Sequence, residues 1–411
     1  MFKNTVLLLV LVLISCGNSP KEKSLSKKAS EKQNTATSYD SVLKTPIVVG
    51  ANKTQDYFPK LSGKTIGIVA NQTSVIFNAN GHTHIVDSLY NSNIKIQTVF
   101  APEHGFRGKA DAGEVVKDGV DTKTGLPIVS LYGSNKKPTP EQLQGIDLII
   151  FDIQDVGARF YTYISTLHYV MEACAENNIS VLVLDRPNPN GHYIDGPILE
   201  PGHKSFVGMH PVPVVHGMTI GEYAQMINGE GWLENGVTCN LDIIKMTNYS
   251  HKTPYSLPIK PSPNLPTDQA INLYPSLCFF EGTNVNAGRG TKTPFEVFGS
   301  PFLNQNTYTF TYTPQSNDGA KYPKHKDVLC YGKKLSQNEP LHRLDLNYLI
   351  EAYNNTSDKT VFFNKFFTKL AGTKTLQKQI EDELTVSEIK KTWALGLKAY
   401  KEMRKPYLLY N

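Results

Sequence analysis

Carboxylate, arginine and asparagine side chains gather in short, glycine-bounded clusters of this 411-residue chain. The first cluster, residues 102–108, places Glu103 beside His104 and is followed by Asp111 and Glu114. A carboxyl group in a water-poor site can hold its proton and act as a general acid, while a second carboxylate assists as base or nucleophile. These residue types therefore favour general acid–base chemistry.

Two further clusters, residues 154–163 and 186–197, have the same character. Arginine and asparagine provide the paired donors and acceptors that sugar hydroxyls, amides and carboxylates need. Tyrosine rings in the same stretch could contact a ligand or pack at the start of the following helix. Together with Arg107 of the first cluster, the candidates are Asp155, Arg159, Tyr161, Tyr163, Arg186, Asn188 and Asn190.

The second half of the chain adds two polar segments. Residues 261–267 form a proline-rich loop, and residues 280–291 are rich in glycine and asparagine and end an apolar run. We expect these segments to meet the first half at a pocket, because ligand sites often lie between domains. The candidates from this half are His216, Asn264, Glu281, Asn284 and Arg289.

Other chemistries lack their motifs. No H-E-x-x-H helix indicates a catalytic metal, and we expect none. No G-x-S-x-G element indicates a serine hydrolase. No G-x-G-x-x-G follows the first predicted strand and no P-loop occurs, so no nucleotide cofactor is expected. The side chains that could still be combined into a metal site are Glu103, His104, Asp155, His168 and His216.

Apolar strands that alternate with helices must position the clusters. Because the strands are apolar without interruption, they predict a parallel sheet covered on both faces. The clusters follow its second, fourth and fifth strands, and open α/β sheets bind ligands at the carboxyl ends of their strands. Strands are expected at residues 65–70, 95–101, 128–132, 147–152 and 180–185, and helices at 84–92 and 161–178.

These elements predict an α/β fold with two domains. Residues 43–205 are expected to form a Rossmann-like, parallel-sheet N-terminal domain. Residues 206–411 are expected to form a smaller α+β C-terminal domain. Its predicted elements are a strand at 239–246 and helices at 221–229, 346–353 and 386–405.

The N-terminus predicts export and lipid anchoring. Residues 6–14 form an apolar run behind Lys3, which is typical of a signal peptide and shorter than the ~20 residues of a membrane-spanning helix. The sequence Leu-Ile-Ser-Cys at 13–16 has the pattern of a lipobox, so residues 1–16 are expected to direct lipidation of Cys16. Residues 17–42 are polar and predict a flexible tether. We expect a folded part that is periplasmic or at the cell surface.

The net charge and the cysteines exclude further classes. The formal net charge is +5, and several of the lysines lie in the predicted tether, so no nucleic-acid partner is expected. The cysteines show no close spacing of a zinc or redox motif. Buried thiols and a disulfide both stay open for Cys174, Cys239, Cys278 and Cys330.

Several long motifs carry a family resemblance. They read FAPEHGFRG, DAGE, FDIQDVGARFYTYISTL, LDRPNPNG, HGMTIGEY, PSPNLPT and YPSLCFFEGTNVNAGRGT. From about residue 45 to the C-terminus the chain resembles the NamZ-like exo-β-N-acetylmuramidase family. The resemblance implies a Rossmann-like domain, a smaller second domain, and an active cleft between them. It also implies release of N-acetylmuramic acid from the non-reducing end of peptidoglycan fragments.

The resemblance indicates Glu103 as the catalytic carboxyl, and burial in a cleft would keep it protonated. Asp155 is the second candidate, as a base or orienting group, and His104 is expected to tune Glu103 or bind the sugar. One or two of the arginines are expected to bind the lactyl carboxylate of muramic acid. The rival hypotheses are a non-catalytic lipoprotein that binds muropeptides, and an amidase or esterase that acts on the same fragments.

Overall fold

In a computed structural model of the chain, residues 45–103, 105–107 and 118–411 are described. The predictions for Cys16, His104, Asp111 and Glu114 lie outside the described residues. Thr45–Asn411 form one compact unit by their internal contacts.

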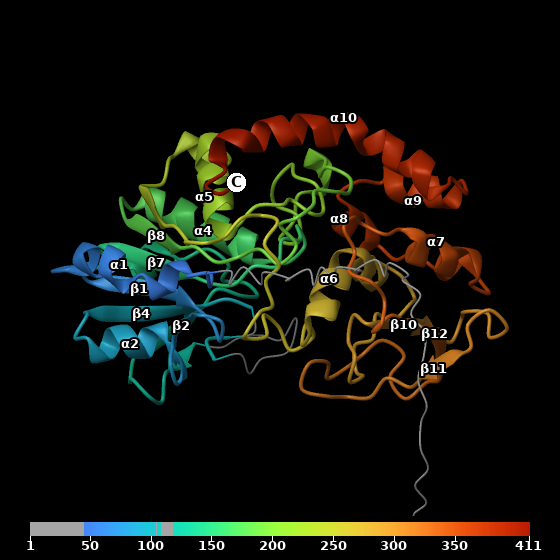
Figure 1. The fold of residues 1–411 in the computed structure, drawn as a ribbon, viewed down its shortest axis with the longest axis horizontal. Helices are drawn as coiled ribbons and strands as arrows, with labels where there is room; N and C mark the ends of the chain where they lie inside the picture. The colour runs from blue at the N-terminus through green and yellow to red at the C-terminus, as the bar shows by residue number, and fades with distance from the viewer. Residues whose placement is uncertain (1–44, 104, 108–117) are drawn as a thin grey trace, which may run out of the picture. The chain divides into compact units, whose positions relative to one another are not determined.

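A seven-stranded sheet forms the centre of the first half of this unit, which extends to the end of β9. The strand order is β5-β6-β4-β1-β7-β8-β9 (Figure 1). Neighbouring strands are parallel except for β5 and β6. The six parallel strands have the order of a Rossmann fold, with the switch point between β1 and β7. The strands are β1 Ile66–Ala70, β4 Ile96–Ala101, β5 Gly119–Val120, β6 Pro127–Ser130, β7 Leu148–Asp152, β8 Ser180–Leu184 and β9 Leu241–Ile244.

The two faces of the sheet pack into separate apolar cores. Val69 and Phe151 point into one core, which also contains residues of α4 Tyr163–Glu176 and α5 Ile220–Gly229. Ile68 and Ile150 point into the other, which contains residues of α1 Thr54–Leu61 and α2 Ile85–Asn91. Adjacent residues thus face opposite sides, as the period of a strand requires. The predicted parallel sheet covered on both faces is confirmed.

The sheet extends past residue 205, the predicted end of the first domain. β9 pairs in parallel with β8, in the register Val181↔Leu241 to Leu184↔Ile244. The strand expected at 239–246 therefore forms the edge of the large sheet. α5, which begins at a capping box of Thr219 and Glu222, connects the two strands.

The second half packs several helices and a small antiparallel sheet against the first. The sheet has the order β10-β12-β11, with β10 Val297–Ser300, β11 Phe310–Tyr312 and β12 Cys330–Lys334. The helices are α6 Asp268–Leu277, α7 Asn347–Asn354, α8 Phe367–Ala371, α9 Thr375–Glu381 and α10 Val386–Arg404. One large core contains side chains from both halves.

The remaining elements are short. A hairpin of β2 Val75–Asn78 and β3 Gly81–His84 precedes α2, and α3 Pro140–Leu143 precedes β7. The 3₁₀ helices are η1 Gly50–Asn52, η2 Pro201–His203, η3 Glu234–Gly236, η4 Cys278–Gly282, η5 Lys359–Val361 and η6 Lys405–Tyr407.

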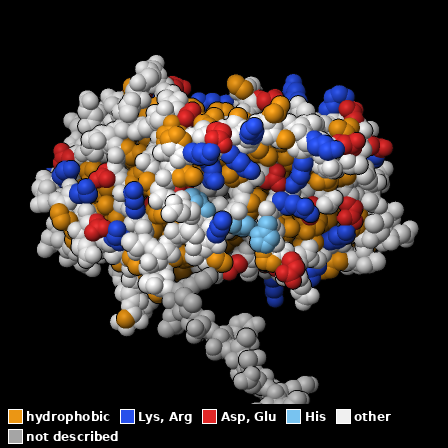
Figure 2. All heavy atoms as spheres, turned by 45° about the horizontal axis from the view of Figure 1, so that its top comes forward, with side chains coloured by type: hydrophobic (Ala, Val, Ile, Leu, Met, Phe, Trp, Pro, Cys, Tyr) orange, Lys and Arg blue, Asp and Glu red, His pale blue; other side chains and the backbone are white. Residues whose placement is uncertain are grey.

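The C-terminal helix α10 returns the chain to the first half (Figure 1). The Tyr400 hydroxyl donates to the carbonyl of His216 over 2.8 Å, and Arg404 donates to the carbonyl of Gly217 over 2.5 Å. Figure 2 turns the α10 side forward and shows Lys and Arg side chains interspersed with Asp and Glu.

The described residues also show whether a helix could span a membrane and how the cysteines are arranged. None of their helices combines the length and apolar composition needed to cross a bilayer. All four cysteines among them are buried free thiols, which decides between the two alternatives left by the sequence.

Candidate active site

A cavity of about 590 Å³ lies at the carboxyl edge of the large sheet, where both halves contribute walls. Glu103 reaches it two residues after the end of β4, and Tyr132 reaches it two residues after the end of β6. Phe160, Tyr161 and Thr162 enter from the loop between β7 and α4. The second half contributes side chains from segments 262–265, 274–295 and 319–324.

Hydroxyl groups hold the Glu103 carboxyl in this cavity. Thr162 Oγ1 donates to Glu103 Oε2 over 2.7 Å, and the side chain of Tyr132 also bonds to the carboxyl. Burial and the neighbouring Glu103 carboxyl raise the pKa of Tyr132, so that this phenol keeps its proton. The Tyr163 hydroxyl lies 3.4 Å from the backbone oxygen of Glu103. The predicted catalytic carboxyl is therefore fixed from several sides.

A carboxylate–guanidinium pair lines another part of the cavity. Arg289 Nε lies 2.7 Å from Glu281 Oε1, and the two side chains are 23% and 26% exposed. Burial works against ionisation of Glu281, but Arg289 and Lys324 outweigh it, and the pKa of Glu281 lies below its ordinary value. Within the described chain, the two Nη groups of Arg289 make no hydrogen bond. They remain available to an anionic ligand.

Lys324 fixes the loop that carries this pair. Its ammonium donates to the carbonyl oxygens of Phe280, Thr283 and Val285 at 2.8, 2.5 and 2.9 Å. Burial lowers the pKa of Lys324, although Glu281 partly offsets that effect. Because the three carbonyls occupy its donors, Lys324 contributes a fixed positive charge beside Glu281.

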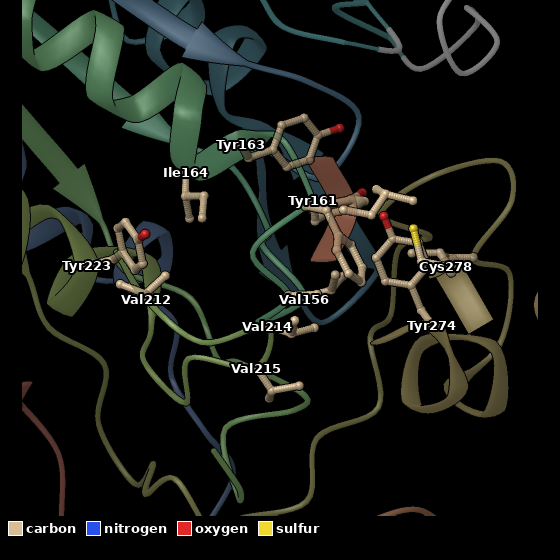
Figure 3. Packing of buried hydrophobic residues seen from close by; sticks show 14 of the residues in the cluster. Val156, Tyr161, Tyr163, Ile164, Val212, Val214, Val215, Tyr223, Tyr274 and Cys278 are labelled. Atoms are coloured by element: carbon tan, nitrogen blue, oxygen red, sulfur yellow. The ribbon is translucent and has the colours of Figure 1, made fainter. Parts of the chain in front are cut away.

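Aromatic rings form the floor between the two halves. In Figure 3 the ring of Tyr161 lies between Tyr163 and Tyr274, and the sulfur of Cys278 lies beside the Tyr274 hydroxyl. The ring centroids of Tyr161 are 4.9 Å from Tyr163 and 5.9 Å from Tyr274, both edge-on. The Tyr161 hydroxyl donates to the carbonyl of Pro261 over 2.7 Å. Tyr161 lines the cavity, whereas Tyr163 is buried behind it.

Asn264 lines the cavity and orders its far wall. Its Nδ2 atom donates to the carbonyl of Gly319 over 2.5 Å. Segment 319–324, which includes Lys321 and Lys324, is thereby connected to the proline-rich loop. The predicted candidates that the structure brings together are Glu103, Tyr161, Asn264, Glu281 and Arg289.

Three candidate arginines do not line this cavity. Arg107 pairs with Asp121 and Asp87 at 2.7 and 3.1 Å, beside a separate hollow at the β2–β3 hairpin. Arg159 is fully buried and donates to the carbonyls of Pro197, Val212, Leu370 and Ala371. Arg186 is 3% exposed and pairs with Asp152 at 2.6 Å. Each of them braces the fold.

Asp155 and His216 lie near each other and outside the cavity. Asp155 Oδ2 accepts from the backbone N–H of Gly157 over 2.7 Å and lies 3.6 Å from His216 Nε2. Both side chains are buried, and neither lines the cavity. The structure therefore separates Asp155, the second catalytic candidate, from the pocket that contains Glu103.

The candidate asparagines outside the cavity have structural contacts. Asn188 donates to the carbonyl of Met218, and Asn190 donates to those of Val156 and Ile271. The side-chain amide of Asn284 has no hydrogen-bond partner in the described part of the chain and does not line the cavity.

Several cavity residues were not among the predicted candidates. Thr162, Ser262 and Asn286 belong to the clusters already noted, so their polar neighbours were a usable signal. Tyr132 is the last residue of a predicted strand, so nothing in the sequence distinguishes it from an ordinary strand residue. Lys321 and Lys324 lie in an irregular segment far from every cluster. The cavity residues missed are Tyr132, Thr162, Ser262, Tyr274, Asn286, Lys321 and Lys324.

The donor set of the cavity suits a polar organic ligand. Across residues 45–103, 105–107 and 118–411, no group of three or more His, Cys, Asp or Glu side chains is arranged to hold a metal ion. A cavity of about 590 Å³ lies within the usual range for small-molecule sites. Its hydroxyls, amides, charged pair and aromatic walls match the groups on an acidic amino sugar.

The chain matches two family models in succession. Residues 66–269 match the model described as the N-terminal part of the exo-β-N-acetylmuramidase NamZ, and residues 272–410 match the C-terminal part. The chain is 40% identical over 375 residues to the peptidoglycan β-N-acetylmuramidase NamZ of Bacillus subtilis (strain 168), covering 86% of this chain and 89% of that relative.

Two crystal structures share the fold. A DUF1343 family protein from Bacteroides fragilis superposes with a TM-score of 0.82 at 45% identity, covering 89% of this chain and 99% of the other. A second DUF1343 family protein from the same organism has a TM-score of 0.74 at 28% identity, with the same coverage.

Proposed function

The chain belongs to the NamZ exo-β-N-acetylmuramidase family, as its motifs predict, and we infer that it removes terminal N-acetylmuramic acid from peptidoglycan fragments. We propose that the cavity around Glu103 is the site of this hydrolysis. The observation that carries the proposal is the hydrogen bond of 2.7 Å from Thr162 to Glu103, which holds one carboxyl inside a sugar-sized pocket.

In the proposed reaction Glu103 is the general acid. It transfers its proton to the glycosidic oxygen while the bond from that oxygen to the anomeric carbon breaks. Water then adds to the anomeric carbon, and the proton that it releases restores the Glu103 carboxyl, so the products are free N-acetylmuramic acid and a shortened glycan. Thr162 and Tyr132 aim the carboxyl and limit its rotation.

Arg289 is the proposed receptor for the lactyl carboxylate. It is the cavity arginine, and Glu281 occupies only its Nε atom. A guanidinium suits this task because its remaining N–H groups can bind a carboxylate in a fixed orientation. Glu281 would keep the guanidinium in place. The lactyl group distinguishes muramic acid from N-acetylglucosamine, so this contact would set sugar specificity.

Hydrolysis of a nitrophenyl β-glycoside of N-acetylmuramic acid by the full chain tests the proposal. We expect release of nitrophenol together with free N-acetylmuramic acid that keeps its acetyl and lactyl groups. Release from the N-acetylglucosamine analogue should be much slower. Tight binding without turnover would establish the sugar-binding rival instead. Loss of an acyl group or a peptide, with the glycosidic bond intact, would establish the amidase or esterase rival.

We also propose that Cys16 carries a lipid anchor. The support is the lipobox pattern at 13–16 behind an apolar run, followed by a polar tether. The protein is then exported and attached to a membrane, with the enzyme in the periplasm or at the cell surface. A Cys16→Ser variant tests this, since it should move from the membrane fraction to the soluble fraction. A variant that stays in the membrane fraction would contradict the anchor.

A further inference from the structure

A second hollow adjoins the cavity that contains Glu103. It has a volume of about 650 Å³ and lies along the proline-rich stretch 258–263. Gln72, which follows β1, and Asp318 form other parts of its wall. Ser262 and Lys321 line both hollows, so the two share a border.

Tyr163 connects Glu103 to this border, and Tyr161 binds the same border residue, Pro261. The carbonyl of Pro261 accepts from the Tyr161 hydroxyl at 2.7 Å and lies 3.5 Å from the Tyr163 hydroxyl. The same Tyr163 hydroxyl lies 3.4 Å from the backbone oxygen of Glu103. The carboxyl-bearing residue is thus close to the segment that separates the two hollows.

The border segment, Lys260 to Ser262, is also held by Gln72. Gln72 Nε2 donates to the carbonyls of Lys260 and Pro261 at 3.1 Å each. Prolines fix much of its backbone, since each ring restricts φ. A rigid rim of this kind can position a chain that crosses it.

The position of a general acid constrains where the leaving group lies. It must contact the oxygen between the departing sugar and the rest of the glycan. A cavity of about 590 Å³ accommodates the terminal sugar, so the remaining chain has to extend past Glu103. The neighbouring hollow begins at the segment that Tyr163 connects to Glu103.

We propose that this second hollow is the aglycone subsite and that Lys260 binds a carboxylate on the glycan beyond the cleaved bond. The proposal rests on the proposed function. Its occupant is a peptidoglycan strand of at least three sugars, because the next carboxylate belongs to the muramic acid after the leaving N-acetylglucosamine. Lys260 is exposed, and among the described residues its ammonium has no ion pair.

Two other charges face this subsite. Lys321 adds positive charge from the shared border, and Asp318 adds a negative charge that opposes a glycan carboxylate. Asp318 opposes an anionic chain, so the ammonium of Lys260 has to provide the attraction for a glycan carboxylate. Binding energy gained here, away from the reacting bond, would raise kcat/KM for glycans above that for simple glycosides.

The test compares two substrates with Lys260→Ala. The first is the nitrophenyl β-glycoside, whose small leaving group carries no carboxylate for Lys260 to bind. The second is a tetrasaccharide of alternating N-acetylmuramic acid and N-acetylglucosamine. We expect the variant to retain wild-type kcat/KM on the first and to lose about fivefold on the second, as for an exposed ion pair. Lys260→Glu should lose more on the tetrasaccharide.

Controls separate this proposal from other effects. A tetrasaccharide whose internal lactyl carboxyl is amidated should be cleaved equally by the wild type and Lys260→Ala. Lys95→Ala changes an exposed lysine before β4, at the opposite end of the strand from Glu103, and should alter neither substrate. Asp318→Asn should preserve or increase cleavage of the tetrasaccharide.

Two outcomes would overturn the inference. One is an equal loss on both substrates in Lys260→Ala, and the other is no loss on the tetrasaccharide. Failure of the proposed function has a different signature, because the wild-type chain would then cleave neither substrate.

Discussion

Thr162 Oγ1 donates to Glu103 Oε2 over 2.7 Å, and this bond joins the ends of two strands of the large sheet. Glu103 follows β4, and Thr162 precedes α4 after β7, so the two residues lie on either side of central β1. Thr162 is the N-cap residue of α4, yet its side chain makes no capping hydrogen bond. Its hydroxyl, which could cap the helix, instead donates to the Glu103 carboxyl.

Removing this hydroxyl should impair turnover more than substrate binding. We expect Thr162→Val to lower kcat about tenfold with little change in KM, because a hydrogen bond to a charged or reacting group is worth about 1.5–3 kcal/mol. Thr162→Ser should retain most activity because it keeps the donor. Steady-state kinetics on the nitrophenyl glycoside measures both. Equal losses in Val and Ser variants would show that the methyl group, rather than the hydroxyl, matters.

Replacing the carboxyl itself should have a larger effect. Glu103→Gln cannot donate the catalytic proton, so kcat on a glycan should fall by about 10²–10⁴. The loss should be much smaller for a dinitrophenyl glycoside, whose leaving group departs without protonation. Thermal unfolding verifies that the variant folds, and Glu339→Gln, at an exposed carboxylate, is the matched control. Equal losses on both substrates would contradict an acid role.

The parallel sheet could be predicted from the sequence because its central strands have a clear apolar pattern. β1 and β7 are buried at every position, so they read as unbroken apolar runs between helices. The small sheet lacks this signal, since β12 contains Gly332, Lys333 and Lys334. α6 was missed because Pro275 lies inside it, and proline is disfavoured in helix interiors.

The site was only partly accessible for a related reason. Arg186 and Glu103 both follow strands in polar clusters. The neighbouring sequence does not show that Arg186 forms a buried ion pair with Asp152 and is therefore unable to bind a ligand. Pairing across the sheet decides which polar side chains face the cavity. Lys324 reaches the loop of Glu281 only through tertiary packing, 41 to 44 residues from the carbonyls of Thr283 and Phe280 that it binds.

The Arg289 side chain should determine sugar preference. We expect Arg289→Gln to raise KM for the N-acetylmuramic acid glycoside and lower its kcat/KM by about 10- to 100-fold, since a charge-assisted hydrogen bond is lost. Activity on the N-acetylglucosamine analogue should change far less, because that sugar lacks the carboxylate. The ratio of the two kcat/KM values is the measurement. An unchanged ratio would place the lactyl group elsewhere.

The buried pair of Arg186 and Asp152 should contribute to stability rather than to binding. The side chains are 3% and 0% exposed. Burial raises the pKa of Asp152, and Arg186 partly offsets that rise. Arg186→Met should therefore lower the free energy of unfolding by about 3–5 kcal/mol, because it strands a buried carboxylate.

Urea unfolding measures this loss. The double variant Arg186→Met, Asp152→Leu should recover part of it, because no unpaired charge remains. A double variant that is less stable than the single one would contradict this account. KM of the single variant, measured below its unfolding transition, should match the wild type.

The C-terminal Tyr410 should make stability depend on pH through Asp185. Its hydroxyl donates to Asp185 Oδ2 over 2.6 Å, and Thr219 and the backbone N–H of Gly221 donate at 2.8 Å each. Burial nevertheless raises the pKa of Asp185 to about 6. The folded protein thus binds this proton more tightly than the unfolded chain does. The stabilisation is complete below about pH 4 and is lost as pH rises through about 6.

Tyr410→Phe removes a donor that favours the ionised carboxyl, so the pKa of Asp185 should rise further. Its cost in free energy of unfolding should be about 1 kcal/mol larger at pH 8, where Asp185 is ionised, than at pH 5. Tyr407→Phe is the matched control, since its hydroxyl donates over 2.8 Å to the half-buried Glu230 at the C-cap of α5 and should cost the same at both pH values. Urea unfolding at the two pH values measures the difference. If Tyr410→Phe costs the same at pH 5 as at pH 8, Asp185 does not titrate in this window and its carboxyl keeps one charge state throughout.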